Sequence, residues 1–125
     1  MAKAIEPLGS QAEMTGFIPL DQVRDWQERA AIAVCPSLWQ EPLGKVVVEA
    51  LAAGCAVLTT RRGGIPEVAE GRALIIDEPS VVTFRDGFAK LLKDDHFRHQ
   101  LQNIAFTDFP FTSTAMANKV DALRQ

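Results

Sequence analysis

The sequence has few cysteines, and it lacks both a long apolar run and a signal-peptide pattern. Only Cys35 and Cys55 occur in 125 residues. Both have apolar neighbours, so we expect reduced, buried thiols, with a disulfide between them as the alternative. The longest apolar-rich run, 46–58, is interrupted by Glu49 and Gly54 and is shorter than the roughly 20 apolar residues that span a bilayer. The expectation is a cytoplasmic protein without a transmembrane segment.

The sequence also lacks an excess of positive charge and the motifs of two kinds of ligand site. The net charge is -3, so no broad basic face is available for nucleic acid. No Gly-x-Gly-x-x-Gly follows any expected strand, which disfavours a dinucleotide-binding enzyme. His96 and His99 stand three residues apart, but no third ligand is near them, so no metal site is expected.

The chain has short apolar runs that alternate with segments of helical spacing. Its length allows one domain over residues 1–125. Continuously apolar strands between helices indicate an α/β fold with a parallel sheet of about four strands and helices on both faces. The expected strands are 13–18, 31–35, 56–60 and 73–77. Gly44 should open a helix that ends near Ala53, Ser80 should cap another, and Asp94 or Asp95 the next.

Glu49 is the most informative residue. It is the only charged residue between Val46 and Leu58, in a helix apolar nearly all round, which predicts burial. A carboxylate there could pair with Lys45 one turn earlier, a weak pair in this order. The other interpretation is that it faces a cleft and accepts hydrogen bonds from the two adjacent hydroxyls of a ribose.

Glu41 and Gly44 stand just before this helix. The N-terminus of the helix offers free amides to a phosphate, and Gly44 lets a diphosphate approach the backbone closely. In an open parallel sheet such a strand-to-helix loop lies where ligands bind. A single ligand would then contact all three residues, with its diphosphate at Gly44, its ribose at Glu49 and its outer group near Glu41. A solvated acid that favours the helix dipole is the alternative for Glu41.

These residues belong to an ordered set of motifs. The set comprises Pro36-Ser37-Leu38-Trp39-Gln40-Glu41-Pro42-Leu43-Gly44, Glu49-Ala50-Leu51-Ala52-Ala53-Gly54, Gly63-Gly64-Ile65-Pro66-Glu67 and, upstream, Thr15-Gly16-Phe17-Ile18-Pro19. The set resembles the signature of family 4 glycosyltransferases, including its Glu-x7-Glu element from Glu41 to Glu49. The resemblance implies the C-terminal, Rossmann-like donor domain of the GT-B fold. It also implies retaining transfer of a hexose from a nucleoside diphosphate sugar.

The resemblance also implies roles for individual residues. Glu41 would be the catalytic-site carboxylate that orients the transferred sugar, and Glu49 would hold the donor ribose. The remaining donor-binding positions would be the backbone around Leu43, Gly44 and Lys45, the loop residue Ser37, the turn of Gly63 and Gly64, and Glu67 on the short helix behind it. Ser37 and Glu67 have plain alternatives, in turn chemistry and in a helix dipole. No Asp-x-Asp pair occurs, in keeping with a site that needs no metal or other cofactor.

The chain also departs from the family. It has no counterpart of the acceptor-binding domain or of the first strands of the donor domain, with their basic pair. Lys45, Arg61 and Arg62 are basic and near the site, although solvated surface is the simpler interpretation for them. We therefore expect a truncated domain that is inactive without its partner domain. A non-catalytic nucleotide-sugar-binding module and a structural remnant are the alternatives. The strand 31–35 becomes an exposed edge, so either 14–18 pairs somewhere new or two chains associate there as a homodimer.

Overall fold

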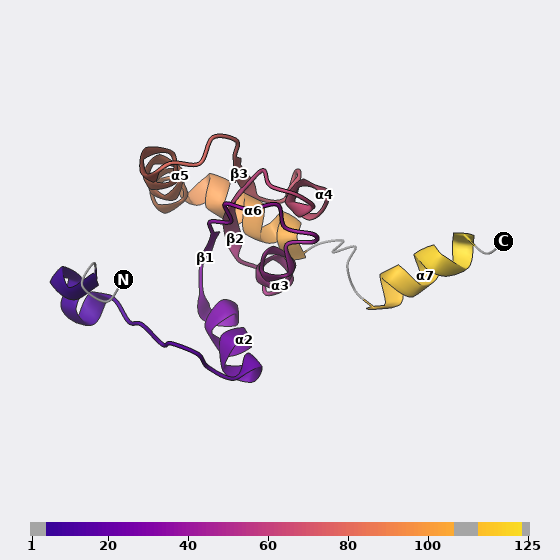
Figure 1. Cartoon of the computed structure of the whole chain (residues 1–125), viewed down its shortest axis with the longest axis horizontal. Helices are drawn as coiled ribbons and strands as arrows, with labels where there is room; N and C mark the ends of the chain where they lie inside the picture. Colours follow the sequence, from indigo (N-terminus) through magenta and orange to yellow (C-terminus); the bar gives the residue numbers. More distant parts are fainter. Residues whose placement is uncertain (1–4, 107–112, 124–125) are drawn as a thin grey trace.

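The computed structural model describes residues 5–106 and 113–123. A short sheet with helices around it forms the body of the molecule (Figure 1). The elements in chain order are η1 (Glu6–Gln11), α2 (Leu20–Arg29), β1 (Ile32–Cys35), α3 (Lys45–Ala52), β2 (Ala56–Thr60), α4 (Ile65–Ala69), β3 (Leu74–Ile76), α5 (Val81–Lys93), α6 (Asp95–Phe106) and α7 (Ser113–Leu123).

The sheet has three parallel strands in the order β1-β2-β3. Ile32 pairs with Ala56, and Leu58 pairs with Leu74. The parallel α/β architecture is as predicted, with three strands in place of about four. The missing strand is the expected one at 13–18, where the chain forms neither strand nor helix. Gly16 there has φ +64, which interrupts an extended backbone.

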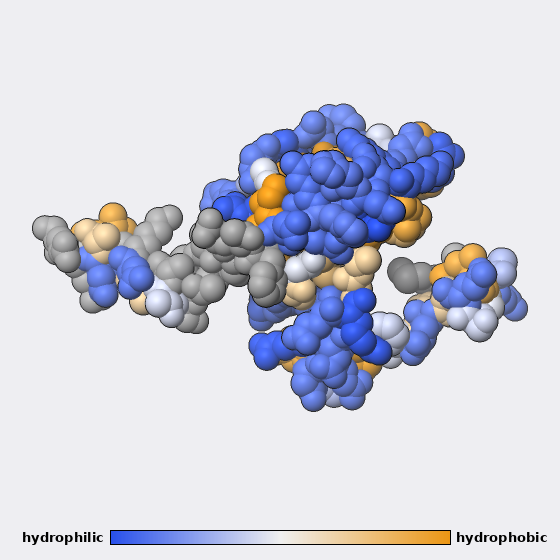
Figure 2. Space-filling model, turned by 180° about the vertical axis from the view of Figure 1, so that it is seen from behind, coloured by the Kyte–Doolittle hydropathy of each residue, from blue (hydrophilic) through white to orange (hydrophobic). Residues whose placement is uncertain are grey.

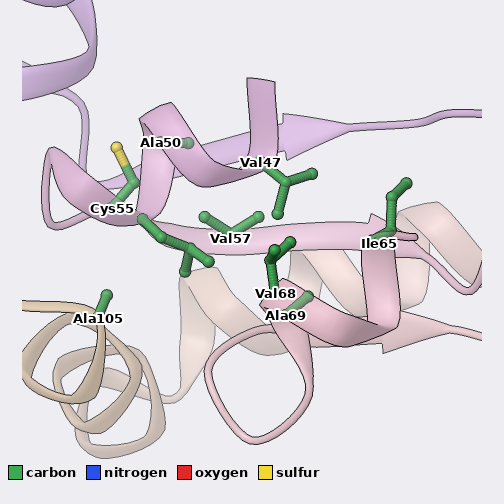
Figure 3. Close-up of a cluster of buried hydrophobic side chains, with 9 residues drawn as sticks. Val47, Ala50, Cys55, Val57, Ile65, Val68, Ala69 and Ala105 are labelled. Atoms are coloured by element: carbon green, nitrogen blue, oxygen red, sulfur yellow. The ribbon is translucent and has the colours of Figure 1, made fainter. Parts of the chain in front are cut away.

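Helices cover both faces of the sheet, as predicted. Neighbouring residues of a strand point to opposite faces, so Val57 and Leu58 of β2 lie in different clusters. Val57 packs with Val47 of α3 and Val68 of α4 (Figure 3). Leu58 packs with Leu91 of α5 and Leu101 of α6. All of β2 is buried, and burying each large apolar side chain stabilises the fold by about 1.5–3 kcal/mol.

The predicted burial of α3 on all sides is wrong. The helix buries Val47, Ala50 and Leu51, but Val46 is 59% exposed. Its neighbours β1, β2, α4 and α6 cover only its inner side. The bounds of the helix do follow the prediction, because Gly44 is its N-cap at φ +70 and Gly54 follows its C-cap at φ +82.

Strand β1 is an edge of the sheet and pairs only with β2 among the described residues. Val34 on this edge is 44% exposed, in agreement with the expected apolar edge. Residues 14–18 form no strand, so the first of the two expected alternatives, new pairing of this segment, is wrong. Association of two chains through the edge stays a prediction.

The periphery of the molecule is more open than its body. Helix α2 buries no residue, and Figure 1 shows η1 and α7 apart from the sheet and its helices. From behind, the surface of the body is mostly hydrophilic with small separate hydrophobic patches (Figure 2). No helix in the part of the chain that the structure describes is long and apolar enough to cross a membrane.

Candidate functional site

A pocket opens at the carboxyl end of β1. Its volume is about 330 Å³, which lies within the range of small-molecule sites. Apolar side chains form most of the wall, and Ser37, Glu41 and Lys45 are its polar members. The loop from Pro36 to Gly44 supplies one side of the pocket and the first turns of α3 supply another. The predicted Ser37, Glu41, Gly44 and Lys45 are therefore brought together.

Hydrogen bonds within the loop hold Glu41 in place. The Ser37 hydroxyl donates to Glu41 Oε1 at 2.8 Å. The carbonyl of Ser37 accepts a hydrogen bond from Thr60 Oγ1 at 2.6 Å, so the loop is tied to the end of β2. Among the described residues no group donates to Glu41 Oε2. This oxygen keeps its capacity to accept from a ligand hydroxyl.

Gly63 and Gly64 bring a second loop against the first. The Gly64 amide donates to the Glu41 carbonyl at 2.6 Å, and the Gly63 amide donates to Gln40 Oε1 at 2.5 Å. A Cβ on Gly63 would lie 2.5 Å from the backbone nitrogen of Glu41, and one on Gly64 would clash with the Pro42 carbonyl oxygen. Both positions need glycine because the two backbones touch. The pair thus supports the loop from behind and does not line the pocket.

The N-terminus of α3 faces the same loop. Gly44 precedes it in a left-handed conformation, and no side chain caps the helix. A Cβ on Gly44 would lie 2.8 Å from Ile65 Cγ1, so this glycine also permits close packing against α4. The first-turn amides of a helix lack partners within the helix. They give this end of the pocket hydrogen-bond donors and a positive dipole end.

Glu49 lies one turn beyond Lys45 and is not among the residues that line the pocket. Its side chain is 30% exposed, and Oε1 lies 3.8 Å from Lys45 Nζ, whose side chain is 79% exposed. Such an exposed i,i+4 pair stabilises a helix by only about 0.2–0.5 kcal/mol. The carboxylate is therefore paired weakly with a protein cation and is still accessible to solvent.

The other predicted residues lie outside the pocket. Leu43 is 51% exposed, and Glu67 is an exposed residue of the first turn of α4. Arg61 pairs with Glu70 at 2.7 Å and with Asp77 at 2.5 Å. The hydrogen bond to Glu70, and to a smaller extent that to Asp77, raises the pKa of the Arg61 guanidinium above its usual range. Arg61 thus connects the ends of β2, α4 and β3 at the surface.

Sequence reasoning missed three supports of the site: Gln40, Thr59 and Thr60. Thr59 Oγ1 donates to the Cys35 carbonyl at 3.0 Å, in the same way as Thr60 to Ser37. Both threonines are fully buried. Two hydroxyl residues at the carboxyl end of an otherwise apolar strand are a signal for such supports, because buried hydroxyls require acceptors.

The two cysteines are free thiols in the structure, so the disulfide alternative is not realised. Cys35 lines the pocket. Burial, and secondarily the charge of Cys55, raise the pKa of its thiol to about 11. Among the described residues, no group of three or more His, Cys, Asp or Glu side chains is placed to hold a metal ion.

Comparison with known proteins identifies the family. The family model for glycosyl transferases group 1 matches residues 3–108. The chain belongs to this family. Proteins with similar sequences include the putative glycosyltransferase YtcC of Bacillus subtilis. It is 34% identical over 118 residues, which are 89% of this chain and 28% of that protein.

Solved glycosyltransferase structures share the fold. Sucrose-phosphate synthase from Thermosynechococcus elongatus superposes with a TM-score of 0.78 at 22% identity, over 98% of this chain and 32% of that one. Anabaena Alr3699/HepE in complex with UDP and glucose superposes with a TM-score of 0.73 at 18% identity, over 99% and 35%. The fold is therefore that of the Rossmann-like C-terminal domain of GT-B enzymes. The chain spans less than a third of the length of the curated relatives that it matches.

Proposed function

We propose that this chain is the donor-binding part of a retaining glycosyltransferase, and that it binds a nucleoside diphosphate sugar from which a hexose is transferred. The observation that carries the proposal is the arrangement of Glu41. Ser37 donates to one carboxylate oxygen at 2.8 Å, and no group among the described residues donates to the other. Glu41 lines a pocket that Gly44 and Lys45, at the uncapped N-terminus of α3, also line. A hydroxyl-binding carboxylate beside an anion-binding helix end suits a sugar joined to a phosphate.

The donor would bind with its diphosphate against the backbone amides of Leu43, Gly44 and Lys45. During transfer the bond between the anomeric carbon and the phosphate oxygen breaks, and the leaving diphosphate takes the electron pair. Preorganised amides at a helix N-terminus stabilise charge that develops on such a group. This part of the chemistry requires no metal ion, so we propose a metal-independent site.

Glu41 and Glu49 would bind the two sugars of the donor. Oε2 of Glu41 would accept from hydroxyls of the hexose and orient it for transfer. Glu49 would accept from the ribose hydroxyls. Its present contact with Lys45 is long, at 3.8 Å, and Lys45 is exposed, so a diol could displace the ammonium at little cost. Gly63 and Gly64 would act by holding the Glu41 loop, and Glu67 would favour the dipole of α4 behind it.

Transfer would further require a wall opposite the pocket. Trp39 and Val46, on its rim, are 69% and 59% exposed, so water has access to the proposed reaction centre. Water competes with the acceptor in an open site. We therefore expect this chain to bind the donor by itself and to transfer sugar only when an acceptor-binding domain is supplied.

Calorimetric titration of the chain with UDP, GDP and ADP and with their glucose conjugates tests the proposal. One nucleoside diphosphate should bind and raise the unfolding midpoint; at 100 times its dissociation constant the stabilisation is about 2.7 kcal/mol. Glu49→Ala should weaken the nucleoside diphosphate and its sugar conjugate equally. Glu41→Gln should weaken only the conjugate.

Lys45→Met is the matched control for Glu49, because it removes the same ion pair and leaves the carboxylate. Lys45→Met should retain most of the wild-type affinity for the nucleoside diphosphate and its sugar conjugate. If Lys45→Met and Glu49→Ala have the same effect, the carboxylate has no separate role in binding the ribose. If none of the three nucleotides or their conjugates binds, the donor-binding function is refuted.

A further inference from the structure

Trp39 is a large aromatic residue that lines the pocket and takes no part in the hydrophobic core. It stands two residues before Glu41, lines the same pocket, and is 69% exposed. It belongs to neither core cluster. The other tryptophan, Trp26, makes a cation–π contact with the guanidinium of Arg29, which lies 4.8 Å from the ring centre. Within the described part of the chain, Trp39 has no such partner.

The loop presents Trp39 and Glu41 as a pair. The backbone of Glu41 is fixed by the Gly64 amide and its carboxylate by Ser37. Val34, Pro36 and Val46 line the same pocket. A carboxylate next to an aromatic and aliphatic wall complements a pyranose ring, which has hydroxyls at its edge and C–H groups on its faces. Aromatic residues with a polar atom suit ligands of this mixed character.

We propose that Trp39 is a specificity-determining residue that packs against a C–H face of the donor hexose while Glu41 accepts from its hydroxyls. This inference rests on the proposed function. The nucleobase is the other flat group that a tryptophan could stack on. The base would be attached to the ribose at Glu49, which lies outside the lining of the pocket. The hexose would be attached to the diphosphate at Gly44, which shares the pocket with Trp39.

The test compares Trp39→Ala with Trp39→Phe by calorimetric titration with UDP and with UDP-glucose. Trp39→Ala should bind UDP-glucose about tenfold more weakly and bind UDP within about twofold of the wild type. Trp39→Phe keeps a ring and should recover most of the affinity. Leu38→Ala is the matched control, because Leu38 is 68% exposed in the same loop but does not line the pocket. It should bind both probes as the wild type does.

Fluorescence gives a second readout, because the chain has only two tryptophans. In a Trp26→Phe variant Trp39 is the only indole, and UDP-glucose should change its emission more than UDP does. Equal weakening of UDP and UDP-glucose in Trp39→Ala would place the ring on the nucleotide and overturn the proposal, as would unchanged affinity for both. If the wild type binds neither probe while GDP or ADP binds, the same comparison is made with that nucleotide and its glucose conjugate. If no nucleotide binds, the proposed function fails and this inference fails with it.

Discussion

Substitution of Gly64 by alanine tests the contact between the two loops. Gly64 has φ -78 and ψ -2, a conformation that alanine adopts without strain. The added Cβ would clash with the Pro42 carbonyl oxygen and lie 3.0 Å from the Pro42 carbonyl carbon. Both atoms belong to the backbone, so no side chain can rotate away. The loop must shift, and the hydrogen bond from the Gly64 amide to the Glu41 carbonyl, 2.6 Å long, must lengthen or break.

The expected loss of unfolding free energy is about 1–3.5 kcal/mol. Overpacking of this kind costs about 1–3 kcal/mol, and the lost hydrogen bond costs about 1 kcal/mol. Alanine recovers about 0.4–1 kcal/mol, because it restricts the unfolded chain more than glycine does. Gly71→Ala is the matched control. Gly71 has φ +74 and open space around the Cβ position, so its substitution introduces only backbone strain of about 1–2 kcal/mol, reduced by the same gain of about 0.4–1 kcal/mol from the unfolded chain.

Urea denaturation followed by far-ultraviolet circular dichroism measures both variants. If the dependence of the unfolding free energy on urea concentration is unchanged, Gly64→Ala should lower the urea midpoint by on the order of 1 M. Gly71→Ala should lower it by less. Gly64→Ala should also weaken binding of a nucleoside diphosphate sugar, because Glu41 moves with the loop. If Gly64→Ala is no more destabilising than Gly71→Ala, the two backbones are not in the contact described above, and the explanation of the glycine pair is wrong.

Four further predictions concern other contacts. Ser37→Ala should lower the unfolding free energy by about 1 kcal/mol through loss of the 2.8 Å bond to Glu41; a urea midpoint equal to that of the wild type would contradict this. The folded-state pKa of Cys35 is raised to about 11 from 9.0, so the thiol favours folding below pH 9 and its contribution is lost as the pH rises toward 11. The urea midpoint should fall over that window, and less so in Cys35→Ala; equal falls in both proteins would refute the assignment. Arg61→Ala should lower the midpoint slightly at low salt and hardly at all at about 1 M salt, because its pairs with Glu70 and Asp77 are exposed; a loss that salt does not reduce would argue against an electrostatic origin. The free edge of β1 should produce dimers in light scattering, and Val34→Lys should dissociate them; a wild type that is monomeric at every concentration would exclude this association.

The local patterns of the sequence predicted most elements around the site. The bounds of α3 follow from Gly44 and Gly54, and β2 from an apolar run. Ser80 caps α5 as expected, with its side chain accepting from the Thr83 amide. Asp94, one of the two alternatives, caps α6 by accepting from the Phe97 amide at 2.9 Å. Each of these features depends on residues that are close in sequence, so the local sequence pattern is sufficient to predict it.

The errors concern long-range contacts. Residues 14–18 have an apolar pattern, but Met14 is 49% exposed and Phe17 fully exposed, and no strand in the described part of the chain pairs with them. The exposed side of α3 could not be read from its composition, because it depends on which distant elements pack against the helix, and β1, β2, α4 and α6 cover only its inner side. The contact of Gly63 with Gln40 joins residues 23 positions apart. Local reasoning therefore predicted a turn at the glycines but not the loop that they touch.

The loop from Pro36 to Gly44 is held in part through its backbone carbonyls: that of Glu41 accepts from the Gly64 amide and that of Ser37 accepts from Thr60 Oγ1. Its outward side chains, among them Leu38, Trp39 and Leu43, are exposed and contribute little to folding. Substitutions at these three positions should therefore change the free energy of unfolding very little. Of the three, only Trp39 lines the pocket, so under the role proposed for Trp39 a change of donor sugar at this position would leave the scaffold intact. Directed evolution of donor choice should begin there.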